Sequence, residues 1–252
     1  MPSFAIVRCV DLDQHTVLIT GGGSGIGFAL AKRFVQAGSD VIICGRCERR
    51  LRKAKQQCPQ FHTRVCDIEQ ESERIALRDW ASSRFPRLDV LVNNAGIQRH
   101  VQIAGNADWE SARQEIVINF EAQVHLCILL IPELSRRQRS TIINITSGLS
   151  FVPLAAAPIY SATKAALHSF TLSLRHQLKN TSIDVIEIAP PAVNTDLGGP
   201  GLHDFGVPLD EFAAVMEERL KQGDAQITYQ FSEKTSQASP RERQEIFARL
   251  NQ

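Results

Sequence analysis

Near the start of the chain, an apolar run leads directly into a glycine-rich turn: TVLITGGGSGIG, residues 16–27. The run at 16–20 is short and β-branched, which is typical of a buried strand, and a helix-period pattern opens at Gly25. Glycines let the backbone turn tightly and approach a pyrophosphate, and a helix N-terminus adds free N–H groups and partial positive charge. The stretch therefore predicts a dinucleotide-binding turn with contacts from Thr20, Gly21, Gly23, Ser24, Gly25, Ile26 and Gly27.

The rest of the chain repeats this alternation of short apolar runs and longer amphipathic runs. Strands are expected at 16–20, 40–44, 61–66, 88–92, 141–146, 183–189 and 227–229. Helices are expected at 25–37, 47–58, 72–85, 109–136, 158–179 and 209–221, with a last one after the N-cap sequence Ser239-Pro240. The pattern predicts an α/β protein: one Rossmann-type domain over 1–252, with a doubly wound parallel sheet of about seven strands and helices on both faces.

Composition narrows the class of protein. The 252 residues are 43% hydrophobic and carry a net charge of +1, which fits a globular core and gives no indication of nucleic acid as a partner. The longest apolar run, 124–131, is too short to span a bilayer and is followed by Pro132, and residues 1–13 contain no signal-like apolar block. We therefore expect a cytoplasmic protein with no membrane partner. The pair Cys44 and Cys47 lacks further ligands at metal spacing, so we expect reduced thiols and no metal.

The residues after the second and third strands bear on the choice of cofactor. Gly45 stands where a carboxylate would bind the adenosine ribose of NAD, and Arg46 follows it, with two more arginines close behind. A guanidinium suits a ribose phosphate, so the sequence favours NADP(H), with NAD(H) as the alternative. These arginines could equally form a solvated helix face. Asp67 and Ile68 are placed to contact adenine, although Asp67 could instead be a helix N-cap.

Five motifs stand in order along the chain: Thr20-Gly21-x-x-x-Gly25-Ile26-Gly27, Asn93-Asn94-Ala95-Gly96, Asn119, Ser147 and Tyr160-Ser161-Ala162-Thr163-Lys164. On these residues the chain resembles the short-chain dehydrogenase/reductase family over nearly its whole length. More narrowly, it resembles the branch labelled as oxidoreductases of the D-alanyl-lipoteichoic-acid operon. The family's usual Pro-Gly after the sixth strand is Pro190-Pro191 here, although Val193 and Thr195 keep their places. Pro191 removes a backbone donor from the loop that is expected to lie beside the nicotinamide.

Four polar residues carry the expected chemistry. Tyr160 and Lys164 are four apart on a helix and share one face, so the ammonium is expected to stabilise the phenolate of a tyrosine acid/base. Ser147 follows a strand and could hydrogen-bond the substrate oxygen. The resemblance gives Asn119 a supporting role in a water chain that resupplies protons through Lys164. Taken singly, each could be an ordinary helix or turn residue. Asn94, Ala95 and Gly96 are expected to pass close to the cofactor, although the asparagine amides could instead serve a structural role and tie neighbouring strands together. Pro190, Val193 and Thr195 are expected to contact its nicotinamide side.

The expected reaction is reversible hydride transfer between NADP(H) and a carbonyl or secondary alcohol. An epimerase or dehydratase on the same fold, or a silent NADP(H)-binding sensor, are the alternatives. A small, mainly apolar substrate would contact Gln98, Leu149 and Phe151 besides Ser147 and Tyr160, while His100 is expected to face solvent. The loop region 194–225 is expected to form a lid, although an inert surface loop is the alternative. A homodimer or homotetramer is expected through the two long helices.

Overall fold

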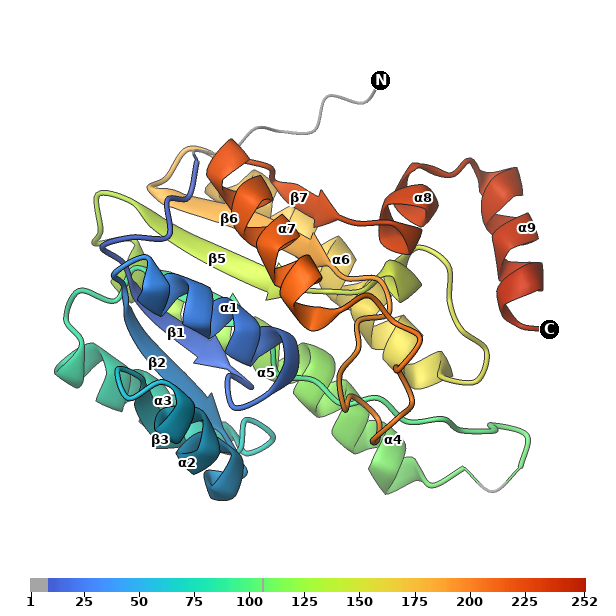
Figure 1. The fold of residues 1–252 in the computed structure, drawn as a ribbon, viewed down its shortest axis with the longest axis horizontal. Coiled ribbons are helices and arrows are strands. Elements are labelled where there is room, and N and C mark those ends of the chain that lie inside the picture. Colours follow the sequence, from blue (N-terminus) through green and yellow to red (C-terminus); the bar gives the residue numbers. More distant parts are fainter. Residues whose placement is uncertain (1–8, 106) are drawn as a thin grey trace.

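A seven-stranded parallel sheet forms the centre of the protein in the computed structural model, which describes residues 9–105 and 107–252 (Figure 1). Its strands are β1 (Thr16–Thr20), β2 (Asp40–Gly45), β3 (His62–Val65), β4 (Val90–Asn93), β5 (Ser140–Ile145), β6 (Ile183–Ala189) and β7 (Gln226–Thr228). Their order is β3-β2-β1-β4-β5-β6-β7, and all neighbours run parallel. The doubly wound parallel sheet expected from the sequence is confirmed.

The strand order reverses between β1 and β4. The chain moves outward from β1 to β3, then returns to place β4 on the other side of β1, where Ile19 pairs with Val92. The loops that follow β1 and β4 therefore emerge side by side. In open α/β sheets, ligands bind beyond the carboxyl ends of the strands at such a reversal.

Helices cover both faces of the sheet. On one face α1 (Gly25–Gln36), α2 (Glu48–Gln57) and α7 (Leu209–Gln222) bury a core with Val17 and Ile19 of β1. On the other face α3 (Glu71–Arg84), α5 (Ala122–Leu134) and α6 (Pro158–Leu178) pack against Leu18. Both faces of β1 are thus buried, because successive side chains of a strand point to opposite sides. This explains why its sequence is an unbroken apolar run.

The structure corrects several expected elements. The single helix expected at 109–136 consists of α4 (Trp109–Ile116), a π-helical turn η1 (Val117–Glu121) and α5, so the helix changes its winding at Asn119. A short helix α8 (Phe231–Gln237) was not predicted, because its polar sequence FSEKTSQ carries no apolar stripe. The last helix, α9 (Pro240–Leu250), begins with the expected N-cap: Ser239 and Glu242 form a capping box.

Among the described residues, one helical stretch, Trp109–Leu134, is long enough to cross a membrane by length and composition alone, because it contains an 18-residue window with a mean hydropathy of 1.4. The 124–131 run identified in the sequence is only part of it. Its residues Leu126, Cys127 and Leu130 are fully buried against the sheet. Packing in the core therefore accounts for much of its apolar character.

Candidate active site

The glycine-rich turn after β1 is clamped to the end of β4. Thr20 Oγ1 accepts hydrogen bonds from the backbone N–H groups of Asn94 and Ala95, both at 3.0 Å. The side-chain amide of Asn94 donates to the Thr20 carbonyl at 2.8 Å. A Cβ at Gly27 would lie 2.3 Å from that amide nitrogen, so glycine is required there. The loops after β1 and β4 therefore form one continuous surface at the strand reversal, which we call the floor of the site.

The N-terminus of α1 opens onto this floor. Ser24 is its N-cap residue, the Ser24 side chain makes no capping bond, and the first turn holds no acidic residue. Gly25 has a φ of +55°, a conformation that glycine adopts without steric cost. A Cβ there would lie 3.5 Å from Thr195 Cγ2, which places the loop after β6 against the same turn. Open N–H groups at the positive end of a helix dipole fit a pyrophosphate group.

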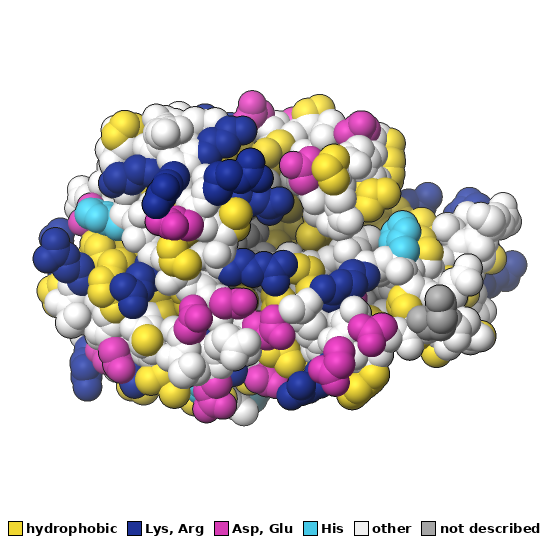
Figure 2. All heavy atoms as spheres, turned by 90° about the horizontal axis from the view of Figure 1, so that it is seen from below, with side chains coloured by type: hydrophobic (Ala, Val, Ile, Leu, Met, Phe, Trp, Pro, Cys, Tyr) yellow, Lys and Arg dark blue, Asp and Glu magenta, His cyan; other side chains and the backbone are white. Residues whose placement is uncertain are grey.

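Basic residues lie beside the glycine-rich turn. Arg46 is exposed directly after β2, and Arg50 lies so close that its Cβ would be 3.4 Å from a Cβ at Gly23. Figure 2 shows Lys and Arg side chains on both sides of a hollow in this face, with Asp and Glu side chains gathered mainly below them. Arg50, an exposed residue of α2 (Glu48–Gln57), therefore lies beside the turn, and Arg46 lies at the end of the neighbouring strand β2.

Asp67 is not the N-cap that the sequence left open as an alternative. The N-cap of α3 is Gln70, three residues further on. The Asp67 carboxylate instead accepts a hydrogen bond from the Glu69 N–H at 3.1 Å, within its own loop, and the neighbouring Ile68 is buried. The carboxylate thus belongs to the loop after β3, at the same edge of the sheet.

Tyr160 and Lys164 lie on one face of α6, and both are buried. The Lys164 ammonium is 5.7 Å from the centre of the Tyr160 ring and donates a hydrogen bond to the Ile145 carbonyl at 2.7 Å. Burial raises the pKa of Tyr160 to about 12, which outweighs the hydrogen bond from Ser147. Burial also lowers the pKa of Lys164 to about 8. The lowering of the tyrosine pKa by lysine that we expected does not occur in the chain by itself, because desolvation dominates and the ammonium is engaged with a carbonyl.

Ser147 is held from both sides where β5 ends. Its hydroxyl accepts a hydrogen bond from the Leu149 N–H at 3.1 Å, within the short helix η2 (Gly148–Ser150). The Gly148 N–H donates to the carbonyl of Pro190 at 2.8 Å, which ties this turn to the loop after β6. Pro190-Pro191, which stands where the family usually has Pro-Gly, therefore still provides the Pro190 carbonyl as a hydrogen-bond acceptor.

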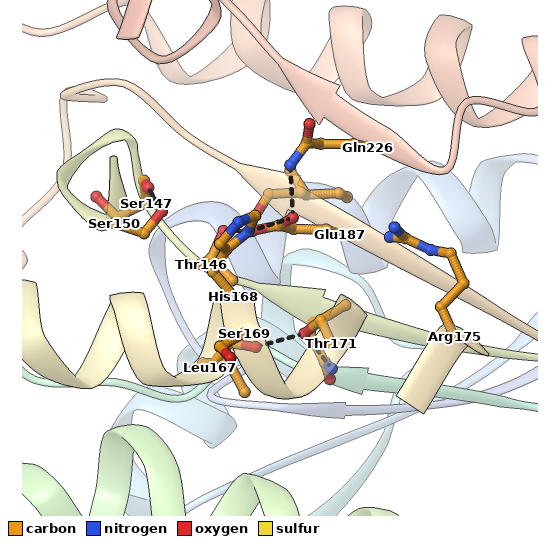
Figure 3. Close-up of polar contacts among 12 residues, drawn as sticks. Thr146, Ser147, Ser150, Leu167, His168, Ser169, Thr171, Arg175, Glu187 and Gln226 are labelled. Atoms are coloured by element: carbon orange, nitrogen blue, oxygen red, sulfur yellow. Dashed lines mark hydrogen bonds and ion pairs between the residues drawn. The ribbon is translucent and has the colours of Figure 1, made fainter. Parts of the chain in front are cut away.

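Behind Ser147, a buried carboxylate links three strands to α6 (Figure 3). Glu187 of β6 is fully buried and accepts hydrogen bonds from Thr146 Oγ1 at 2.7 Å, His168 Nδ1 at 2.9 Å and Gln226 Nε2 at 2.7 Å. Burial alone would raise the pKa of Glu187, but these donors, led by His168, hold it below its ordinary value. His168 stands four residues after Lys164, so the cluster joins the helix that carries Tyr160 to the strand end that carries Ser147.

Asn119 lies in the π-helical turn, fully buried. Its side chain pairs reciprocally with the backbone of Ile97: Nδ2 donates to the carbonyl and Oδ1 accepts from the N–H, both at 2.8 Å. A Cβ at Gly96 would lie 3.3 Å from Asn119 Oδ1 and 3.7 Å from Lys164 Nζ. The loop after β4 therefore passes close to both side chains.

The residues expected around the substrate have different environments. Gln98 is buried, Leu149 is half-buried, and His100 is exposed, as expected. Phe151 packs edge-on against His168, with ring centres 5.0 Å apart, and lines an apolar cavity of about 210 Å³ with Pro153 and Phe247 of α9. The structure thus turns Phe151 towards the C-terminal helix.

Three residues in or next to this site were missed in the sequence: Glu115, His168 and Glu187. A signal existed for each. Glu115 precedes Asn119 by one helical turn, and His168 follows Lys164 by one turn, so both share a face with a candidate residue. Glu187 is the charged residue within the apolar part of the run IDVIEIA, where an unpaired carboxylate would be costly.

The structure thus places a glycine-rich turn at a strand reversal beside a cluster of Ser147, Tyr160, Lys164 and Asn119, the motifs on which the resemblance to dehydrogenases rests. The sequence profile described as short chain dehydrogenase matches residues 15–203, and the chain belongs to the short-chain dehydrogenase/reductase family. Within the described residues, no group of three or more His, Cys, Asp and Glu could hold a metal ion.

Two curated proteins illustrate the relationship. The chain is 46% identical to the uncharacterized oxidoreductase DltE of Bacillus subtilis (strain 168), over 95% of this chain and 98% of that protein. This agrees with the branch expected from the sequence. It is 34% identical to the NADP-dependent 3-hydroxy acid dehydrogenase YdfG of Salmonella typhimurium, over 70% of this chain and 72% of that one.

Among solved structures, a short chain dehydrogenase from Burkholderia cenocepacia in complex with NADP has a TM-score of 0.83 at 23% identity, covering 96% of this chain and 99% of that chain. A family member from Burkholderia phymatum in complex with NAD has a TM-score of 0.81 at 19% identity, covering 96% and 97%. These likenesses show the fold.

Proposed function

We propose that this protein transfers hydride reversibly between NADP(H) and a carbonyl compound or its secondary alcohol, with Tyr160 as the acid/base. The observation that carries the proposal is the meeting of Ser147, Tyr160, Lys164 and Asn119 beside the glycine-rich turn. A protein that only bound a nucleotide would have no need of a buried proton donor next to a serine hydroxyl. Two relatives, sulfoacetaldehyde reductase 2 of Chromohalobacter salexigens and the 3-hydroxy acid dehydrogenase YdfG, have names that describe the same reaction class.

Each residue has a defined part in the proposed reduction. A bound cofactor would supply the hydride, and the open N–H groups at the start of α1 would hold its pyrophosphate. The Ser147 hydroxyl donates to the substrate oxygen, where negative charge develops. Tyr160, whose pKa is about 12 in the chain by itself, is protonated at neutral pH and gives its proton to that oxygen. Lys164 and Asn119 keep the proton route behind the tyrosine ordered.

Two arginines support the preference for NADP(H). Arg46 follows β2 where the adenosine ribose is expected, and Arg50 lies against the glycine-rich turn. No carboxylate stands at Gly45 to repel a ribose phosphate. A guanidinium that binds a phosphate forms charge-assisted, bidentate hydrogen bonds, which the hydroxyl of NAD cannot match.

Further parts of the proposal concern the lid, the assembly and the location. The stretch 194–225 begins with a loop in which Gly198, Gly199 and Gly201 adopt positive φ, which suits a segment that closes over a substrate. Trp109, Ile128 and Leu172 are exposed on α4, α5 and α6, and they favour a homodimer or homotetramer through these helices. A cytoplasmic location remains a prediction.

Cofactor titration followed by turnover tests the function. NADPH and NADH are titrated into the purified protein, and NADPH oxidation is then followed with a panel of carbonyl probes that includes para-nitrobenzaldehyde. We expect tighter binding of NADPH, and a fall in kcat of about 10²–10⁴-fold in Tyr160→Phe with NADPH affinity kept.

Tyr229→Phe is the matched control, because Tyr229 is the second of the two tyrosines and its hydroxyl is bonded to Glu211 at the surface, away from the cluster. Failure to bind either nucleotide would refute the proposal, and so would full turnover by Tyr160→Phe. Equal affinities for the two nucleotides would refute only the preference for NADP(H).

A further inference from the structure

A buried carboxylate beside the four proposed catalytic residues has no part in the mechanism above. Glu115 is the buried residue of α4 and is 1% exposed, although its neighbours Gln114 and Glu110 are half-buried or exposed. A carboxylate loses much solvation on burial, and such groups are found where they are paired or functional.

The backbone between β4 and α4 connects Glu115 to the proton route. Gly96 lies against Lys164 Nζ and Asn119 Oδ1, and Ile97 is bonded to both ends of the Asn119 amide. Two residues further on, the Arg99 N–H donates to Glu115 Oε1 at 3.3 Å. The four residues 96–99 thus run from the lysine to the carboxylate, while Asn119 and Glu115 stack one turn apart on the facing helix.

Three charged or titratable groups face Glu115. Lys164 and Tyr160 come from α6, which packs against α4, and Arg99 comes from the loop. The Arg99 guanidinium is engaged elsewhere, with the Ser111 carbonyl at 2.8 Å and the Gln114 side chain, so its charge is shared. Burial raises the pKa of Glu115 to about 7, and the opposing charges of Arg99 and Lys164 limit the rise. A carboxyl group with that pKa exchanges protons readily at neutral pH.

We propose that Glu115 is a further proton-transfer residue of this site, passing protons between solvent and Lys164. The inference rests on the proposed hydride transfer. In reduction, Tyr160 gives its proton to the substrate oxygen as the hydride bonds to carbon, and Lys164 returns a proton to the phenolate. The Glu115 carboxyl then gives its proton through water to the Lys164 amine, and the carboxylate takes one from solvent. One proton enters at Glu115 for each alcohol formed, and in oxidation one leaves.

The first test needs neither substrate nor cofactor. Glutamate labelled with ¹³C at the side-chain carboxyl is incorporated, and its NMR signals are followed from pH 4 to pH 9. We expect one signal to titrate near pH 7 and to be absent in Glu115→Gln, which keeps the shape and the acceptor oxygen. Lys164→Met should move that midpoint upward by about half a pH unit or more, because the opposing charge is gone.

Glu110→Gln is the matched control, since it removes the same charge from the exposed surface of the same helix. It should leave the signal near pH 7 in place. A Glu115 midpoint below pH 5, or one that Lys164→Met does not move, would overturn the proposal whether or not the protein turns over a substrate.

The second test uses reduction of para-nitrobenzaldehyde by NADPH. In Glu115→Gln we expect kcat to fall about tenfold with KM nearly unchanged, the solvent deuterium isotope effect to rise, and imidazole buffer to restore part of the rate. Glu115→Asp should recover part of the activity, and Glu110→Gln should match the parent protein. Unchanged kcat and pH profile in Glu115→Gln would overturn the proposal. Absence of turnover in the parent protein would instead refute the proposed function. The NMR titration does not depend on turnover, so it tests the role of Glu115 separately from the proposed function.

Discussion

The buried carboxylate of Glu187 should contribute strongly to stability, and Glu187→Gln measures its contribution. The substitution keeps the shape but replaces one acceptor oxygen with an NH₂ group. Every donor around it then competes for one oxygen, because Thr146, His168 and Gln226 all donate to this carboxylate. Losing a hydrogen bond to a charged group costs about 1.5–3 kcal/mol, and breaking a buried ion pair costs about 3–5 kcal/mol. We expect a loss of about 3 kcal/mol at pH 7.

The pH dependence of this loss has a definite sign. The folded-state pKa of Glu187 is held below its ordinary value, so its ionisation stabilises the fold above the unfolded-state pKa of about 4.3. That contribution is lost as the pH falls through the lower, folded-state pKa. The stability difference between the parent protein and Glu187→Gln should therefore be largest at neutral pH and shrink below about pH 4. Arg175 of α6 also acts on Glu187 and remains charged throughout this range.

Equilibrium urea unfolding at a fixed protein concentration is the assay, followed by the fluorescence of the two tryptophans. A loss of about 3 kcal/mol corresponds to a fall in Tm of roughly 6–12 °C for a chain of this size. Glu245→Gln is the control, because it removes a charge from an exposed pair with Arg241 and should cost no more than about 0.5 kcal/mol. A loss below about 1 kcal/mol at pH 7, or a loss that does not shrink as the pH falls below about 4, would refute this reasoning.

Three further predictions concern the nucleotide floor and the proton route. Arg46→Glu should weaken NADPH binding at least about tenfold and leave NADH binding nearly unchanged, since a carboxylate repels a ribose phosphate. Fluorescence titration measures the two affinities, and equal losses for NADPH and NADH would contradict a role of Arg46 in binding the ribose phosphate. Gly27→Ala should abolish tight nucleotide binding, because its Cβ would meet Asn94 Nδ2 at 2.3 Å; calorimetry with NADPH checks this, and full affinity would show that the floor can shift. Asn119→Ala should destabilise the fold by about 2–4 kcal/mol, because the backbone N–H and C=O of Ile97 would lose their hydrogen-bond partner. Urea unfolding measures this change. A loss of stability under about 1 kcal/mol would mean that water replaces the side-chain amide of Asn119.

Local patterns in the sequence were enough to predict most of the fold. The run Thr16–Thr20 and the turn after it predicted β1, α1 and the glycine-rich turn between them, because buried strands, glycine turns and helix starts depend on neighbouring residues. The helical spacing of Tyr160 and Lys164 likewise predicted that they share a face. Elements without a local signal were missed or misread: α8 has no apolar stripe, and the stretch Val117–Glu121, which forms the π-helical turn, has the pattern of an ordinary helix.

The sequence by itself thus determined the class of fold, most of its elements and the places of the glycine-rich turn, Ser147, Tyr160 and Lys164 along the chain. Only the tertiary structure decided how those residues are charged. Burial raises the pKa of Tyr160 and lowers that of Lys164, and it brings Glu115 and Glu187 into contact with groups far away in the chain. Periodicity acts over one or two helical turns, whereas desolvation and pairing depend on which distant segments pack together, and no local pattern encodes that.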